Sequence, residues 1–507
     1  MTERRVRLRF SGLIAFTAGM ISTLTGFLTV VLVTRNITLY EYGLWYLFSQ
    51  YVSLTSAPLL DVVNFWALRD VARGYPVART ALLSSLLLAS ASSAAYVALI
   101  LWAYRSFSQP LSVLLLGVPQ IFVLYIVSVL TTMVRGYAPH FYGVAQMVFE
   151  FSKVALVYVA LAVLKQGLLG VIVAVMAAYL MQAAFSAAVL SKPLRESRAS
   201  LKRLVRWVKL GWVPLYQDLH HILLNLEPVV VRALRYSEEV IGIRSMSVTL
   251  SSIVMHASSL GVALYPKILR SREGPRGADI EVTLKLEYML AIPLSVGIVM
   301  LAPDLLLLFG RNYLESLYGV WVAAACFLVA ILGMTLDQVI MGAETLDLSE
   351  GVSMRAYAKS LICRVITINV GRAATGVAVL AALLYAMRPS ERWLVAVIWN
   401  AAWLATLLPF EAYKYLLARK LSEFRFPLRN IVRYAVASAL MALLLKAIMA
   451  ILGPPPSTRI TGLACYLTLL VTPTACLYLM VVCLIDPFAQ SLAKAALNVI
   501  KSSVHGR

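Results

Sequence analysis

Charged side chains are scarce in this sequence. Only 14% of its 507 residues are Asp, Glu, Lys or Arg, while 61% are hydrophobic and the mean hydropathy is +0.82. Soluble domains carry about a quarter charged residues. Apolar runs of about 20 residues, the length that crosses a bilayer as a helix, recur along the chain. Because these runs do not alternate with polar residues as β-barrel strands do, the composition predicts a helical membrane protein.

Cysteine and histidine are also few, and they lack the spacing of a disulfide framework or a metal site. The five cysteines all lie in apolar segments without a Cys-x-x-Cys pair, and the five histidines show no ligand spacing. The sequence has no Walker motif or glycine-rich phosphate loop, which argues against direct use of ATP. We therefore expect no cofactor and no metal site. Whether the protein uses a Na⁺ gradient, an H⁺ gradient or the membrane potential as an energy source stays open.

Acidic residues are outnumbered by basic ones, 24 to 45, which gives a formal net charge of +21. In a soluble protein such an excess suggests nucleic acid. Here the lysines and arginines gather in the connections assigned to one side, where they outnumber those on the other side by about three to one. We therefore expect no nucleic-acid partner, a multi-pass protein of the plasma membrane, and both termini in the cytoplasm.

The apolar runs predict an all-α polytopic membrane protein of about fourteen transmembrane helices. Ionisable and proline residues interrupt several runs without shortening them below the length of a span. We place the spans at residues 11–34, 42–65, 80–104, 111–134, 144–164, 168–190, 211–233, 240–265, 286–309, 316–341, 360–386, 393–416, 434–452 and 460–485.

The chain shows a weak internal repeat. At an offset of about 200 residues Gly12 aligns with Gly211 and Gly43 with Gly242, which favours two six-helix lobes of the same orientation. The longest polar connection separates them. The predicted domains are therefore an N-terminal lobe at 1–190, a basic cytoplasmic linker at 191–210, a C-terminal lobe at 211–417, and two extra helices with a cytoplasmic tail at 418–507.

Three short motifs resemble those of a known superfamily. Residues 33–45, Val-Thr-Arg-Asn-Ile-Thr-Leu-Tyr-Glu-Tyr-Gly-Leu-Trp, resemble the first outer loop of polysaccharide-type flippases. Residues 308–316, Leu-Phe-Gly-Arg-Asn-Tyr-Leu-Glu-Ser, resemble the turn between their ninth and tenth helices, and residues 264–267, Leu-Tyr-Pro-Lys, followed by a charged loop, fit the same pattern. The chain is similar over its whole length to the multidrug/oligosaccharidyl-lipid/polysaccharide exporter superfamily, within it to O-antigen-type and lipid II-type flippases.

The resemblance implies two lobes that open alternately around a central cavity and move a polyprenyl-linked glycan across the membrane without covalent chemistry. Fourteen spans rather than twelve resemble the lipid II-type members, in which the last two helices help to shape a lipid-facing groove. A phosphate or pyrophosphate headgroup then needs cations, which arginine provides as a planar fork. The candidate substrate-binding residues are Arg35, Arg232, Arg235, Arg244, Arg372, Asn369 and Asn225.

The seventh predicted span, 211–233, is too polar for a plain membrane anchor. At 100° per residue, Asp218, His221, Asn225 and Arg232 share one helical face. Ionisable groups at membrane depth are costly and usually face protein or water, so this face is predicted to line a cavity. A mutual hydrogen-bond cluster is the alternative. The candidate cavity-lining or gating residues are Asp218, His221, Glu227, Glu150 and Lys153, of which the last two, at i, i+3, are also placed to pair with each other.

Two other functions stay open. A cation-coupled multidrug antiporter of the same superfamily is one, although it predicts fewer arginines at the cavity. A membrane glycosyltransferase or polymer ligase is the other, although the outer loops are short and carry no paired carboxylates. We expect a transporter rather than an enzyme, and a monomer. Its expected partners are membrane lipid, the lipid-linked glycan, and a glycan polymerase or ligase docked on the basic inner face.

Overall fold

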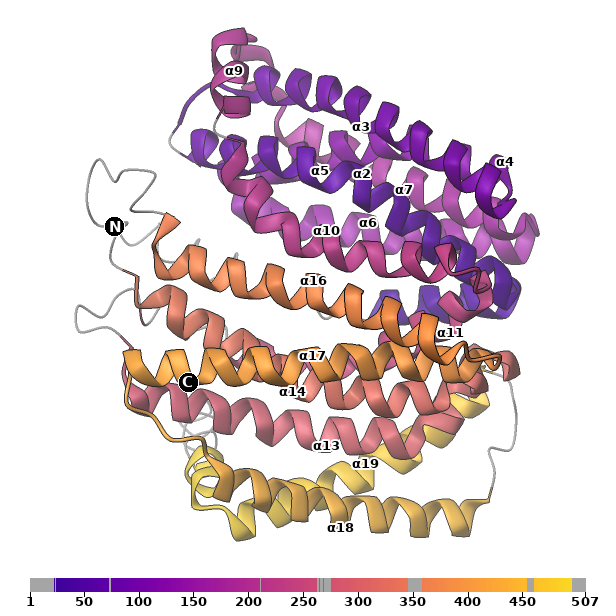
Figure 1. Cartoon of the computed structure of the whole chain (residues 1–507), viewed down its shortest axis with the longest axis vertical. Coiled ribbons are helices and arrows are strands. Elements are labelled where there is room, and N and C mark those ends of the chain that lie inside the picture. Colours follow the sequence, from indigo (N-terminus) through magenta and orange to yellow (C-terminus); the bar gives the residue numbers. More distant parts are fainter. Residues whose placement is uncertain are drawn as a thin grey trace, which may run out of the picture. The chain divides into compact units, whose positions relative to one another are not determined.

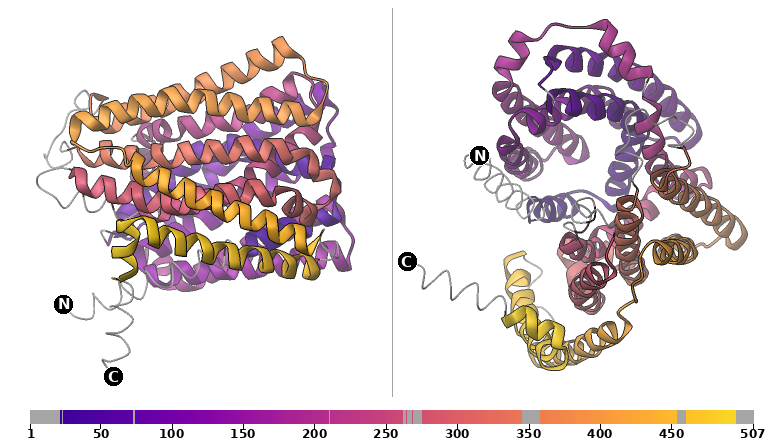
Figure 2. Two further views of the ribbon diagram at one scale, coloured as in Figure 1. Left: turned by 90° about the horizontal axis from the view of Figure 1, so that it is seen from below. Right: turned by 90° about the vertical axis from the view of Figure 1, so that its left-hand side faces the viewer.

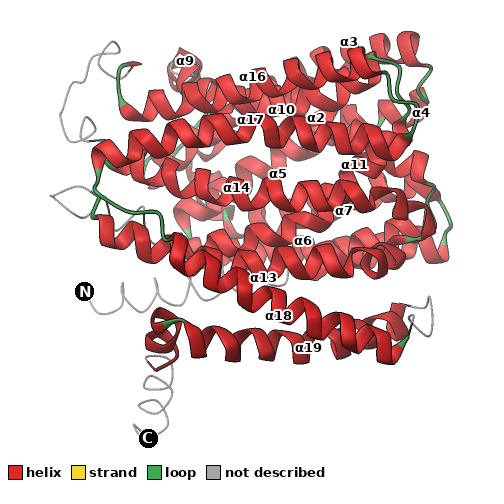
Figure 3. Ribbon diagram, turned by 60° about the horizontal axis from the view of Figure 1, so that its bottom comes forward, coloured by secondary structure: helices red, strands yellow, loops and turns green. Residues whose placement is uncertain are grey.

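The computed structural model describes residues 22, 24–72, 74–209, 211–261, 264, 268, 275–344, 358–453 and 460–494. Within these residues the chain is helical and holds no strand (Figure 3). Eleven of the described helices are long and apolar enough to cross a membrane. The predicted all-α polytopic fold is confirmed. The repeat position Gly12, most of the motif at 264–267 and both ends of the chain lie outside the described residues.

The chain forms two compact units. The first contains Met1–Gly242 and Val377–Met387, and the second contains Ile243–Gly376 and Arg388–Arg507. The division between units falls inside one helix, α11 (Glu238–Ser251), and not at the predicted repeat boundary near residue 211. It falls there because α10 (Trp212–Ala233) packs along α2 (Leu39–Ala72). The proposed repeat itself stays a prediction.

The first unit is a bundle of long helices (Figure 1). Besides α2 and α10 it contains the apolar helix Leu24–Asn36. The remaining helices are α3 (Ala78–Phe107), α4 (Leu111–Leu115), α5 (Gly117–Tyr137), α6 (Pro139–Tyr158) with the π-helical η1 (Val159–Val163), α7 (Gly167–Val189), α8 (Ser191–Glu196) and α9 (Leu201–Lys209).

The second unit begins within α11 and continues as the 3₁₀ segment η2 (Ser252–Gly261). Its last two long helices pack on each other, and the first of them packs on α13 (Figure 2). The helices that follow η2 are α13 (Gly277–Phe309), η3 (Arg311–Ser316), α14 (Leu317–Gly342), α16 (Leu361–Met387), α17 (Arg392–Leu421), α18 (Leu428–Leu452) and α19 (Ile460–Ile485). The last part of α16, Val377–Met387, belongs to the first unit.

Local sequence explains the start of α2 in the first outer loop. Thr38 and Glu41 form a capping box, in which the Glu41 carboxylate accepts from the Thr38 backbone N–H at 2.8 Å and the Thr38 hydroxyl accepts from the Glu41 N–H at 3.2 Å. One turn later Gly43 packs on the backbone of Glu238, and a Cβ at Gly43 would lie 1.8 Å from the Glu238 carbonyl oxygen. The glycine of the motif is thus a packing requirement.

The predicted basic linker folds onto the first unit as α8 and α9. Trp207, which is 1% exposed, donates its indole N–H to Asp70 at 3.2 Å. Arg203 lies 3.7 Å from the same carboxylate and stacks on Tyr75. The carboxylate at the end of α2 therefore fixes a helix that follows it by more than a hundred residues.

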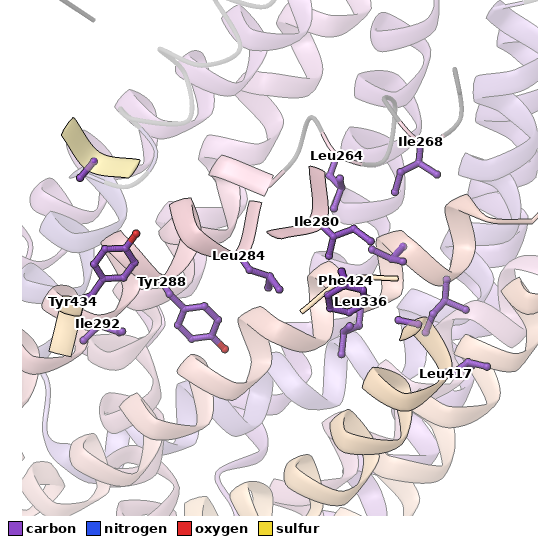
Figure 4. Close-up of a cluster of buried hydrophobic side chains, with 14 of the residues drawn as sticks. Leu264, Ile268, Ile280, Leu284, Tyr288, Ile292, Leu336, Leu417, Phe424 and Tyr434 are labelled. Carbon is purple, nitrogen blue, oxygen red and sulfur yellow. The ribbon is translucent and has the colours of Figure 1, made fainter. Parts of the chain in front are cut away.

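The core of the second unit packs α13, α14, α16 and α17 with the α18–α19 pair. Leu284, Ile280 and Leu336 are fully buried in it (Figure 4). At the end of α19, Asp486 is 0% exposed and accepts hydrogen bonds from Tyr434, Asn430 and Arg433 on α18. This carboxylate fixes the two additional helices to each other.

Apolar side chains also cover much of the outside. Leu87 on α3 is 60% exposed, Ile451 on α18 is 83% exposed and Leu484 on α19 is 70% exposed. Soluble monomers rarely show so much contiguous apolar surface, so these faces are built to lie in lipid.

Candidate substrate site and its polar network

The polar face of α10 turns toward α2 within the first unit. Asn225 donates to the Ser53 hydroxyl at 3.0 Å. Two turns earlier, Asp218 lies against Asp61, with the two carboxyl groups within hydrogen-bonding reach of each other. Because two carboxyl groups share a hydrogen bond only when one carries a proton, this contact changes with the protonation of the pair.

Asp218 lines a cavity of about 330 Å³ in the first unit. The cavity combines two carboxyl groups, a cation and hydrogen-bonding side chains. One Asp218 oxygen is buried and has no hydrogen-bond partner among the described residues, and the Asn64 amide oxygen is in the same state. The residues that line the cavity are Asp61, Asn64, Phe65, Leu68, Thr132, Arg135, Pro214 and Asp218.

Arg232 forms a clamp at the far end of α10. Its guanidinium donates to Glu238 at 2.7 Å, to the Tyr236 carbonyl at 3.0 Å and to the Phe107 carbonyl at 3.0 Å. Glu238 also accepts from Gln109 at 3.0 Å. In this conformation the three guanidinium nitrogens are all engaged by the protein, so Arg232 holds the α10–α11 turn against the end of α3 rather than presenting a free fork to a phosphate.

Arg35 and Arg235, the other predicted cations of this end, are more accessible. Arg235 is exposed and adopts a left-handed backbone with φ of 68° in the turn after α10. Arg35 is half-buried at the end of the helix Leu24–Asn36 and has an interaction of its own. Of the two, Arg235 presents the more open guanidinium.

The remaining α10 candidates differ in burial. His221 is exposed and contacts His220, with ring centroids 3.7 Å apart and the ring planes tilted by 41°. Glu227 is only 6% exposed and also has an interaction partner. Of the two, Glu227 is the residue placed inside the protein.

Glu150 and Lys153 form the predicted pair, with 2.6 Å between the ammonium and the carboxylate. The Glu150 carboxylate also accepts from Ser22 and Thr25, each at 2.6 Å, and from Gln146 at 3.2 Å. A carboxylate with four donors is satisfied, so this site ties α6 to the first helix.

A second charged network lies inside the second unit. Lys414 of α17 is 2.9 Å from Asp337 of α14 and 3.2 Å from Glu411. Asn369 of α16 donates to Asp337 at 3.1 Å. Arg372, one turn further along α16, is half-buried beside Glu411, and its Nε is buried without a hydrogen-bond partner among the described residues.

Arg244 lies elsewhere in the same unit. It is 8% exposed, and its guanidinium stacks on Trp399 with 4.7 Å to the ring centroid. The structure therefore brings Asn369 and Arg372 to one network and places Arg244 against an aromatic ring.

The second unit also contains an apolar groove of about 430 Å³ between α13 and the α18–α19 pair. Among the described residues that line it, the polar side chains are Thr474 and Tyr478, which donate to the backbone carbonyls of Leu470 and Met289, respectively. The described part of the walls therefore offers hydrocarbon and no free hydrogen-bonding side chain. Gly297 lies in one wall, and a Cβ there would meet nothing within 4 Å.

Several solved structures share this architecture. Lipid II flippase MurJ in an inward closed conformation matches with a TM-score of 0.64 and 12% identity, over 95% of this chain and 100% of that chain. An inward-facing multidrug resistance MATE family transporter of the MOP superfamily matches with a TM-score of 0.58 and 14% identity, over 81% of this chain and 98% of that chain. MATE in complex with MaL6 matches with a TM-score of 0.50 and 13% identity, over 82% and 96%.

The chain has the fold of the MOP superfamily. The resemblance predicted from the three motifs is confirmed at the level of fold. No protein-family model matches the sequence, and the comparison with curated protein sequences found no match. The MOP fold alone does not choose between a lipid-linked glycan and a drug as the substrate.

Sequence reasoning missed several residues of these networks. Glu287 is 1% exposed and accepts from Thr335 at 2.6 Å, yet in the sequence it stands at the very start of the predicted span 286–309, next to a charged segment, where a carboxylate looks solvated. Glu238 and Asp70 stand at helix ends, where a carboxylate looks solvated. The usable signal for Glu238 is the short spacing from Arg232 across a turn.

Proposed function

We propose that this protein is a flippase for a lipid-linked oligosaccharide, and that it is a transporter without a catalytic site. It moves the polyprenyl-phosphate or pyrophosphate-linked headgroup across the plasma membrane by alternating access of its two lobes. The observation that carries the proposal is the groove between α13 and the α18–α19 pair, because its walls suit a hydrocarbon chain and nothing polar.

The composition of the groove favours a lipid-linked substrate over a compact drug. A drug-sized site usually contains a few polar groups that fix orientation. Here the hydroxyls of Thr474 and Tyr478 are already bonded to the backbone, so an isoprenoid or acyl chain loses no hydrogen bond on entering. The tail of the substrate therefore stays in an apolar path while the headgroup crosses elsewhere.

Arg372 is the cation that we assign to the phosphate. Its Nε is buried and lacks a hydrogen-bond partner among the described residues. A guanidinium in that state gains bonds when a phosphate oxygen approaches, whereas the Arg232 fork must first break three. Arg35, Arg235, Arg244 and Asn225 stay predicted contacts of the headgroup.

Deleting the gene and analysing the lipid-linked sugars tests this function. We expect an undecaprenyl- or dolichol-type glycan to accumulate on the cytoplasmic face, and the wild-type gene to restore its export. The matched control is a rescue with the variant Gly297→Ala, which adds one methyl group in open space and should restore export as well as the wild type does. Unchanged glycolipids with altered drug tolerance would instead support the multidrug antiporter.

A further inference from the structure

A cationic pocket lies at one end of the second unit, away from the apolar groove. It has a volume of about 400 Å³ between the start of α16 and the end of α17. Three of its residues are cations, one is a tyrosine and two are leucines. They are Arg364, Tyr413, Leu416, Leu417, Arg419 and Lys420.

The three cations have no carboxylate partner among the residues that the structure describes. Arg419 and Lys420 belong to the last turn of α17, where the helix dipole supplies roughly half a negative charge. This offsets only a small part of three positive charges. The pocket therefore keeps a strong positive potential, and an anion is the ligand that its charge selects.

Tyr413 adds a hydrogen-bond donor to this site. Its hydroxyl accepts a hydrogen bond from Arg364, and the guanidinium also stacks over the ring, with 5.8 Å to the centroid. Because the hydroxyl oxygen is the acceptor in this bond, its own proton is free to point at a ligand. Arginine forks together with a hydroxyl donor suit the oxygens of a phosphate group.

The walls distinguish a lipid phosphate from a soluble one. Leu416 is 59% exposed and Tyr413 is 44% exposed, so an apolar side chain stands beside the cations. Arg364 lies in the first turn of α16 and Lys420 in the last turn of α17, both at the ends of helices long enough to span a membrane. At this depth a headgroup meets the cations and the glycerol and first methylenes meet the leucine.

We infer that this pocket is a binding site for the headgroup of an anionic phospholipid. The site is separate from the transport path that we propose for the lipid-linked glycan. It binds a resident membrane lipid at the end of the α16–α17 pair, and it does not depend on which substrate the protein moves.

The test is native mass spectrometry of the full chain in detergent, titrated with phosphatidylglycerol or phosphatidylcholine. We expect retained phosphatidylglycerol adducts, and an apparent Kd weakened about tenfold or more in the triple variant Arg364→Ala/Arg419→Ala/Lys420→Ala. Arg195→Ala, which removes an exposed arginine of α8, is the matched control and should bind as the wild type does. The single variant Arg419→Ala, an exposed position, should show a smaller loss and covers the case in which the triple variant fails to fold.

Three results would overturn the inference. They are equal retention of phosphatidylcholine, unchanged phosphatidylglycerol affinity in the folded single and triple variants, and displacement of the lipid by millimolar inorganic phosphate, which would identify a soluble anion as the ligand. Since the readout is lipid retention, loss of glycan export with intact lipid binding would count against the proposed function alone.

Discussion

Lys414 Nζ lies 2.9 Å from Asp337 Oδ1, and the lysine side chain is only 2% exposed. The ammonium also contacts Glu411, whose side chain is 4% exposed. A buried charge is tolerated only while its partners remain, because removing one partner leaves the other uncompensated. The network therefore fixes α14 to α17 within the second unit.

We predict that Lys414→Ala lowers the free energy of unfolding by about 3–5 kcal/mol, the usual cost of breaking a buried pair. Lys414→Met should cost nearly as much, because it restores volume and no charge. The measurement is thermal unfolding of the purified protein in detergent. Lys446→Ala, at an exposed lysine of α18, is the control, and an equal loss of stability there would contradict this account of the network.

Arg232→Ala is predicted to destabilise the protein by about 3 kcal/mol or more, because it leaves Glu238 buried with one donor, Gln109. Arg235→Ala, in the exposed turn three residues later, should change stability by less than about 0.5 kcal/mol. Comparing the unfolding temperatures of the two variants checks this contrast. Equal temperatures would show that the clamp does not stabilise the α10–α11 turn.

The regular part of the fold follows from the sequence because the apolar periodicity is local. The predicted span 211–233 matches α10, and the predicted pair of Glu150 and Lys153 is present, since i, i+3 neighbours on a helix must meet. The pairing of Asp70 with Trp207 joins positions far apart along the chain, and no periodicity encodes it. The unit boundary inside α11 has the same origin, because it depends on which helix α10 packs against.

The candidate site likewise has features that the sequence predicts and features that only the structure shows. The sequence marks Asp218 as a cavity residue from its helical face, yet it does not reveal that Asp61 faces it. It marks Arg232 and Arg372 equally as cations in apolar runs. Only the structure shows that the Arg232 guanidinium is hydrogen-bonded by the protein, whereas the Arg372 Nε is buried without a hydrogen-bond partner among the described residues.

Arg372→Ala should abolish glycan export and lower stability by less than Lys414→Ala does, because its Nε makes no hydrogen bond in the described residues and Glu411 keeps Lys414 as a partner. Arg372→Lys keeps the charge without the planar fork and should recover only part of the export. Export in cells lacking the chromosomal copy, scaled to the amount of folded protein, is the measurement. Full export by the alanine variant would remove Arg372 from the phosphate site.

The Asp61–Asp218 contact predicts that Asp61→Asn and Asp218→Asn have non-additive effects on the unfolding temperature. The two side chains lie against each other, so either substitution ends the same interaction, and the double variant should differ from the sum of the two single variants. Thermal unfolding of the two single variants and the double variant measures this coupling, with Glu423→Gln, which removes an exposed carboxylate, as the control. Additive effects would show that the two groups do not interact.

In the proposed function, the groove between α13 and the α18–α19 pair holds the lipid tail while the headgroup crosses. The most direct test of this role is translocation by the purified protein in liposomes, using a fluorescent glycan on a polyprenyl pyrophosphate and an impermeant quencher. We predict that the wild type and Gly297→Ala move the substrate, and that Gly297→Phe, whose ring fills the groove from a position with open space around its Cβ, stays folded and does not. Equal translocation by Gly297→Phe, or none by the wild type, would contradict the account.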